Sequence, residues 1–132
     1  MEVDQIIQQL ELQQRLLILS KQQTESGKVE INNPGVLSEV IVKMRMLIVQ
    51  LVDKVAEAEL DYRKSKSARF DRFIKEGIKR SPAFDLLELE PDLIEKKIAT
   101  ERLKNYMKYC DSLVSSVQSL LKVMSSSERN QY

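Results

Sequence analysis

The fold is decided by residues 36–80, which read VLSEVIVKMRMLIVQLVDKVAEAELDYRKSKSARFDRFIKEGIKR. In the first half of this stretch, apolar residues recur at intervals that alternate between four and three positions. They are Leu37, Ile41, Met44, Ile48, Leu51, Val55, Ala58 and Tyr62. This spacing is typical of a coiled-coil seam. It predicts one long helix whose seam needs other chains to cover it.

The second half of the stretch is polar and strongly basic. The same register continues through Ser65, Arg69, Arg72 and Glu76. Between Tyr62 and Arg80 there are eight basic and two acidic residues, which is a charge of +6. Two alternatives stay open for this half: the helix runs on unbroken, or it folds back near Ser65.

Composition also favours long helices in one domain. The chain has 132 residues, of which 42% are apolar and 31% charged, with only three glycines and three prolines. Its net charge of +1 hides opposing blocks: −4 over residues 1–61, +6 over 62–80, −5 over 81–95 and +4 over 96–132. Such segregation indicates charged partners, or ion pairs between the blocks.

The remaining elements follow from turn residues and periodicity. We expect a first helix at 2–23, a loop at 24–35 with a short extended segment at Val29–Ile31, the long helix at 36–80, an acidic connector at 81–90, a last helix at 91–125 and a polar tail at 126–132. The last helix repeats the alternating spacing at Ala99, Leu103, Tyr106, Cys110, Leu113, Val117, Leu120 and Met124.

The predicted fold class is therefore all-α. We expect an elongated antiparallel hairpin of two long heptad helices plus the N-terminal helix, as a single domain 1–132 that is homo-oligomeric through its seams. The predicted oligomer seam comprises Leu37, Ile41, Met44, Ile48, Leu51, Val55, Leu103, Tyr106, Cys110, Leu113, Val117 and Leu120.

Residues that carry catalysis are scarce. The chain has no histidine, one cysteine (Cys110), and three isolated glycines at 27, 35 and 77. These absences exclude common general bases, a conventional zinc site and a glycine-rich phosphate loop. We expect no enzyme, no cofactor and no metal. The N-terminus lacks the pattern of a signal peptide, and apolar runs are too short to span a membrane, so we expect a cytoplasmic protein without membrane contact.

The basic segment has two readings of equal weight. Aromatic residues interleaved with cations are typical of single-stranded nucleic-acid binding, because bases stack on rings while Lys and Arg neutralise phosphates. The candidate binding residues are Tyr62, Arg63, Lys64, Lys66, Arg69, Phe70, Arg72, Lys75 and Lys79. In the alternative, this segment is a solvated helix end that pairs with the acidic residues between Asp85 and Glu95, and its aromatics lie in the core.

Several short stretches of the second half occur in a defined order. They are Val55-Ala56-Glu57-Ala58-Glu59-Leu60-Asp61-Tyr62, Phe70-Asp71-Arg72-Phe73, Lys79, an acidic connector, and a last helix with Tyr106 and Tyr109-Cys110-Asp111 in its middle. In these stretches, over roughly residues 55–132, the chain resembles the recombination mediator proteins of tailed phages, the UvsY type. The resemblance implies a small helical protein that forms a ring-like homo-oligomer, binds single-stranded DNA and helps load a RecA-type recombinase in place of a single-strand-binding protein.

The chain departs from the family pattern before Leu60-Asp61-Tyr62. Glu57 and Glu59 stand where the family carries basic residues that are thought to touch DNA. The DNA contacts implied by the resemblance therefore rest on the residues that follow the motif, which are Arg63, Lys64, Lys66, Arg69 and Arg72.

The function predicted from the sequence is a non-enzymatic accessory factor of phage-type DNA recombination or replication that binds single-stranded DNA. Two alternatives belong to other classes. One is a helical adaptor, or an inhibitor of a host protein, that binds its partner through the seams. The other is a structural virion or scaffold component.

Overall fold

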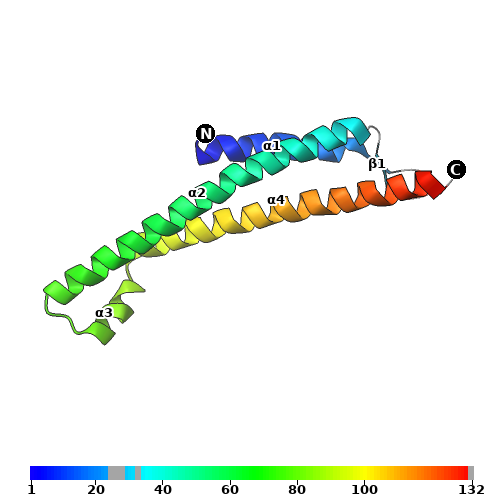
Figure 1. Cartoon of the computed structure of the whole chain (residues 1–132). Helices are drawn as coiled ribbons and strands as arrows, with labels where there is room; N and C mark the ends of the chain where they lie inside the picture. The colour runs from blue at the N-terminus through cyan, green and yellow to red at the C-terminus, as the bar shows by residue number, and fades with distance from the viewer. Residues whose placement is uncertain (24–28, 32–33, 131–132) are drawn as a thin grey trace. The chain divides into compact units, whose positions relative to one another are not determined.

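The computed structural model describes residues 1–23, 29–31 and 34–130. Four helices carry almost all of this chain: α1 (Val3–Ser20), α2 (Pro34–Lys75), α3 (Arg80–Leu87) and α4 (Pro91–Asn130). Two three-residue strands, β1 (Lys21–Gln23) and β2 (Val29–Ile31), lie between α1 and α2 (Figure 1). The predicted all-α class is confirmed. Parts of the predicted loop (24–28, 32–33) and of the predicted tail (131–132) lie outside the described residues.

Contacts within the chain define two compact units, where the sequence predicted a single domain. The first unit contains Met1–Leu51 and Met107–Tyr132, and the second contains Val52–Tyr106. Both α2 and α4 contribute residues to each unit. The candidate binding residues all belong to the second unit, so the site is described within that unit alone.

The first helix ends earlier than predicted. It stops at Ser20, and the backbone of Lys21–Gln23 pairs with Val29–Ile31 in an antiparallel ladder in which Gln22 lies opposite Glu30. Residues 21–23 had been assigned to the helix. Ladder pairing requires extended backbone, which a helical conformation excludes. The extended segment expected at Val29–Ile31 is present as β2.

The core of the first unit is built from three helices. Helix α1 buries Ile6, Leu10, Gln13 and Leu17; α2 buries Leu37, Val40, Ile41, Met44, Leu47, Ile48 and Leu51; α4 buries Cys110, Val114 and Val117. A hydrogen bond from Gln14 Nε2 to Cys110 Sγ (3.4 Å) joins α1 to α4. Every α2 side chain of the predicted oligomer seam, from Leu37 to Val55, is thus buried within one chain. The seam does not need another chain to cover it.

The predicted seam of α4 is only partly buried. Cys110 and Val117 are fully buried, whereas Leu103, Tyr106, Leu113 and Leu120 are half-buried. Val114, which the alternating pattern left out, is fully buried. The helix also continues to Asn130 through most of the predicted polar tail, because Ser125–Asn130 contain no glycine or proline that would stop it.

Helix α2 is continuous past Ser65 but ends at Lys75, five residues before the predicted end at Arg80. Gly77 has a φ of +90°, the left-handed geometry that terminates helices at low cost only with glycine. The N–H of Ile78 donates to the carbonyl of Phe73, and the N–H of Gly77 to that of Ile74. This pair of bonds is the Schellman motif, which satisfies the last helical carbonyls.

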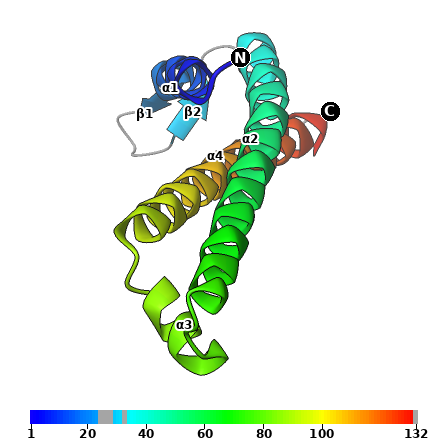
Figure 2. The same ribbon diagram turned by 90° about the vertical axis from the view of Figure 1, so that its left-hand side faces the viewer.

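A short helix, α3, follows where the sequence predicted an acidic connector. Helix α3 begins at Arg80, with Pro82 in its first turn, where the missing N–H of proline has no intrahelical partner to lose. Phe73, Ala83, Leu87 and Leu93 form the apolar cluster of the second unit, and Tyr62, Phe70 and Ile78 pack against it. This cluster folds α3 against the end of α2 (Figure 2).

Candidate nucleic-acid interface

The basic segment occupies the last turns of α2 and the turn before α3. Its cationic side chains are exposed with one exception: Arg63, Lys64, Lys66, Arg72, Lys75, Lys79 and Arg80 are exposed, and Arg69 is half-buried. Glycine at 77 ends the helix between Lys75 and Lys79, so the segment is not one continuous helical surface.

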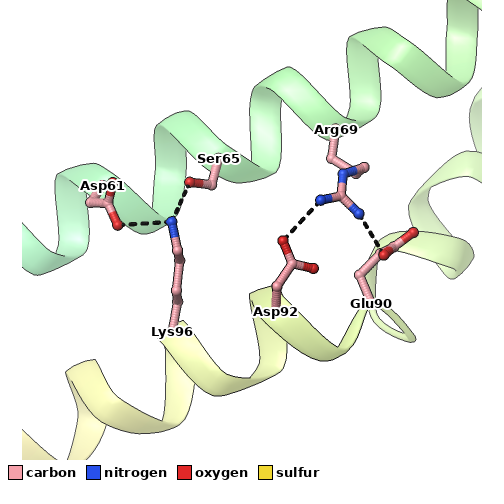
Figure 3. A network of polar contacts seen from close by, with 6 residues as sticks. All are labelled: Asp61, Ser65, Arg69, Glu90, Asp92 and Lys96. Carbon is pink, nitrogen blue, oxygen red and sulfur yellow. Dashed lines mark hydrogen bonds and ion pairs between the residues drawn. The ribbon is translucent and has the colours of Figure 1, made fainter.

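Arg69 is held by two carboxylates. Arg69 Nη1 lies 2.5 Å from Glu90 Oε2, and Arg69 Nη2 lies 2.8 Å from Asp92 Oδ2 (Figure 3). Only 22% of the Arg69 side chain and 24% of the Glu90 side chain are exposed. A planar guanidinium with two carboxylate partners has its charge largely neutralised. This contact is the pairing with the acidic segment that the alternative reading predicted, and it draws Arg69 away from an external ligand.

Further ion pairs join α2 to α4 beside Arg69. Lys96 Nζ lies 3.0 Å from Asp61 Oδ2 and donates a hydrogen bond of 2.9 Å to Ser65 Oγ (Figure 3). Lys104 Nζ lies 3.5 Å from Glu59 Oε1. Ser65 and Arg69 are the positions at which the seam register of α2 turns polar, and both contact α4 or the residue before it. The polar half of the register is therefore used for contacts within the chain.

The two candidate aromatic residues, Tyr62 and Phe70, differ in the contacts that their rings make within the protein. The Phe70 ring stacks on Phe84 of α3, with centroids 4.7 Å apart and planes inclined by 27°. Tyr62 packs against the same apolar cluster, and the Lys66 ammonium lies 5.9 Å from the centroid of its ring. Phe70 is engaged by another ring, as the alternative reading expects. Tyr62 lines two clefts of about 490 and 360 Å³, whereas Phe70 lines a smaller one of about 180 Å³ together with Phe84. Tyr62 therefore has more room for a ligand beside its ring.

Two more cations lie over aromatic rings. Arg72 is 5.8 Å from the Phe73 centroid and is also paired with Glu76 across one helical turn at 3.6 Å. Arg80 is 5.8 Å from the Phe84 centroid. Contacts of this kind at exposed positions contribute about 0.5–1 kcal/mol each. They orient the cations without neutralising them.

The clefts bring in residues of α4 that sequence reasoning missed. One cleft of about 490 Å³ and another of about 360 Å³ are both lined by Tyr62 and Lys66 of α2 and by Lys97 and Glu101 of α4. Lys97 belongs to the +4 block of the C-terminal segment, which carried no motif. Its position beside Lys66 depends on the packing of α4 on α2, so no local signal in the sequence could have identified it.

The described residues contain no group of three or more His, Cys, Asp or Glu side chains arranged to hold a metal ion. Among the helices described, none combines the length and the apolar character that crossing a membrane requires.

Comparison with known proteins produced no match: no family model, curated protein or solved structure is similar to this chain.

Proposed function

We propose that this protein is a non-enzymatic factor that binds single-stranded DNA through the exposed cations of residues 62–80. One observation carries the proposal: the segment keeps a set of exposed cations that form no ion pair with any described residue. These are Arg63, Lys64, Lys66, Lys75, Lys79 and Arg80. Glu90 and Asp92 are paired with Arg69, and Glu76 within the segment is paired with Arg72.

Uncompensated cations of this density favour a polyanionic ligand. Each Lys or Arg that neutralises a phosphate releases condensed counterions, so several weak contacts add to useful affinity without reading the base sequence. Lys64 and Lys75 are three helical turns apart, about 16 Å along α2, which suits an extended backbone that contacts successive turns. Tyr62 provides an aromatic surface for a base.

The cellular role follows from the resemblance of residues 55–132 to the UvsY-type mediators. In this proposal the protein acts in phage-type DNA recombination or replication, in the cytoplasm of the host cell. There it helps a RecA-type recombinase to replace a single-strand-binding protein on the strand. Its partners are then single-stranded DNA, the recombinase, the single-strand-binding protein and further copies of itself.

The proposed assembly is a homo-oligomer of helical hairpins. Within the second unit, contacts pair the higher-numbered residue of α4 with the lower-numbered residue of α2: Lys104 with Glu59, and Lys96 with Asp61. This order supports an antiparallel hairpin. Since the α2 part of the predicted seam is buried within one chain, we place the contact between copies on the opposite face of α2. There Val42, Met46 and Val49, at intervals of four and three, are about 60% exposed.

A second candidate, a helical adaptor or inhibitor of another protein, is favoured by the same exposed face. An apolar stripe on a helix suits a partner helix of any origin. The mass of the assembly in solution separates the two candidates. A homo-oligomer that dissociates in Met46→Glu supports the DNA-binding assembly, and a monomer supports the adaptor.

The direct test is fluorescence anisotropy with a labelled single-stranded oligonucleotide at several salt concentrations, beside a duplex control. We expect binding that prefers the single strand and weakens steeply with salt. Lys64→Glu combined with Lys75→Glu should weaken it at least tenfold, because each change removes a phosphate contact in every subunit. These positions are better than Arg69, whose replacement would also break its pairs with Glu90 and Asp92.

The matched control is Lys43→Glu combined with Lys108→Glu, which reverses two exposed cations outside the basic segment. It keeps the same net charge as the test variant and should lose much less affinity. Equal losses in the two double variants would show that only net charge matters. The absence of wild-type binding at low salt, with the protein folded, would overturn the proposal.

A further inference from the structure

A groove between α2 and α4 lies beside the basic segment within the second unit. It consists of the two clefts of about 490 and 360 Å³, which share four lining residues: Tyr62, Lys66, Lys97 and Glu101. Volumes in this range are those of sites that hold small organic ligands, about 300–1,000 Å³. The groove therefore has room for a single nucleotide.

The smaller cleft is electropositive. Arg63, Lys66, Lys97 and Lys104 line it together with Glu59 and Glu101. Lys104 and Glu59 pair with each other at 3.5 Å. Three exposed cations then remain against one carboxylate, that of Glu101, and they come from two different helices. Cations of both α2 and α4 can therefore contact an anionic group in this cleft.

The larger cleft is apolar along one wall. Leu87, Leu93, Ile94 and Ile98 line it beside the Tyr62 ring, and its two cations, Lys66 and Lys97, are matched in number by the carboxylates of Glu88 and Glu101. An uncharged, flat group is favoured here, because the lining carries no net charge and the group can cover exposed apolar surface of Ile94 and Ile98. The shared residues connect this wall to the electropositive cleft.

From this arrangement we infer that the groove holds one nucleotide of a bound single strand, with its base against Tyr62 and its phosphate between Lys66 and Lys97. The inference rests on the proposed function and extends the DNA site from α2 onto α4. In the free protein the Lys66 ammonium lies over the Tyr62 ring at 5.9 Å. The base replaces it there, and Lys66 turns to the phosphate, so a cation–π contact is exchanged for stacking and an ion pair.

The test compares two alanine variants on the same helix. Lys97→Ala removes a cation of the groove, and Arg102→Ala removes an exposed cation that lines neither cleft. With a labelled oligothymidylate at low salt, we expect Lys97→Ala to bind about three- to tenfold more weakly. The slope of log affinity against log salt should fall in magnitude by about 0.7, the value for one contact to a single-strand phosphate. Arg102→Ala should keep the wild-type slope.

Neither Lys97 nor Arg102 forms an ion pair with another described residue. Both variants should therefore have the same thermal unfolding curve as the wild-type protein. Equal affinities and slopes for the two variants would overturn the inference and leave the proposed function standing. If the wild-type protein binds no single strand, the proposed function itself fails. If Lys97→Ala weakens the binding of an acidic peptide but not the binding of oligothymidylate, the groove binds protein and the inference is wrong.

A spectroscopic measurement tests the place of the base. The chain has no tryptophan, so its tyrosine emission can be followed directly. Stacking of thymine on Tyr62 should quench part of this emission. Tyr62→Phe keeps an aromatic surface and should bind within about twofold of wild type, but without that quenching. Quenching that persists unchanged in Tyr62→Phe would exclude Tyr62 as the stacking surface.

Discussion

The two units of this protein use helices of similar character in different ways. In the first unit, α1, α2 and α4 bury continuous apolar faces, and few polar side chains take part. In the second unit the apolar cluster is small, with Phe73, Ala83, Leu87 and Leu93 at its centre, and ion pairs hold α4 beside α2. The comparison shows that one helix, α2, changes its mode of packing along its length, from burial to charge pairing.

This difference has a functional consequence. A region held by charge pairing must carry cations and anions at its surface, and only some of them are matched. In the second unit Arg69 is matched by Glu90 and Asp92, whereas Lys64 and Lys75 have no carboxylate partner among the described residues. The unmatched cations are the basis of the proposed DNA site. The first unit contains the larger set of buried apolar side chains and the surface proposed for assembly.

The largest expected effect tests burial in the first unit. Met44 is fully buried and Met46, two residues later on α2, is 62% exposed. Met44→Ala should lower the free energy of unfolding by about 2–5 kcal/mol, because it removes buried apolar volume and leaves a cavity. Met46→Ala, measured at a protein concentration below that of assembly, should change it by less than about 0.5 kcal/mol. Urea denaturation at a fixed protein concentration measures both, and equal effects would contradict the assignment of the core face.

An intermediate effect is expected in the second unit. Arg69→Ala leaves Glu90 and Asp92 without their partner and should lower the free energy of unfolding by about 1–2 kcal/mol, between the values for exposed and for buried pairs. Arg72→Ala removes an exposed pair with Glu76 and an exposed cation–π contact with Phe73, and should cost no more than about 1 kcal/mol. Thermal or urea unfolding distinguishes them.

For DNA binding we expect the reverse order: Arg72→Ala should have the larger effect and Arg69→Ala the smaller one. Arg72→Ala should reduce the salt dependence of oligonucleotide binding, since the pair of Arg72 with Glu76 is exposed and leaves Arg72 accessible to a phosphate. Arg69→Ala should leave the salt dependence nearly unchanged, since Arg69 is held by two carboxylates. If Arg69→Ala reduces the salt dependence and Arg72→Ala does not, Glu90 and Asp92 release Arg69 when DNA binds. The ion pairs of the free protein would then not determine which cations contact DNA.

Periodicity was sufficient to predict the all-α class and the buried face of α2, because the spacing of Leu37, Ile41, Met44 and Ile48 is a local property. It could not predict what covers that face. The sequence pattern is the same whether a second chain or α1 and α4 of the same chain pack on this face. We had expected other chains to cover the seam, and the α2 seam residues are already buried within one chain. The predicted end of α2 at Arg80 lies five residues too late, because the left-handed conformation of Gly77 already terminates the helix.

For the site, the sequence located the basic segment but not its pairing. Both readings of Arg69 fitted the sequence, since the choice depends on whether Glu90 and Asp92 come within reach once α3 has turned the chain. Lys97 was missed for the same reason: it carries no motif and acquires its place only through the packing of α4. Charge composition predicts that cations are present, and tertiary structure decides which of them are free.

The smallest expected effect concerns a polar residue in the apolar unit. Gln13 lies on the buried face of α1 between Leu10 and Leu17, and its Oε1 has no hydrogen-bond partner among the described residues. A buried acceptor without a donor costs about 1–3 kcal/mol, whereas leucine has a similar volume and no polar atom. Gln13→Leu should therefore raise the free energy of unfolding by up to about 1 kcal/mol in urea denaturation. Gln9→Leu, at an exposed position of the same helix, is the control and should have almost no effect. If Gln13→Leu is destabilising, Gln13 has a polar partner that the single chain does not provide, such as a bound water or a second copy, and the first unit is then less purely apolar than its contrast with the second unit implies.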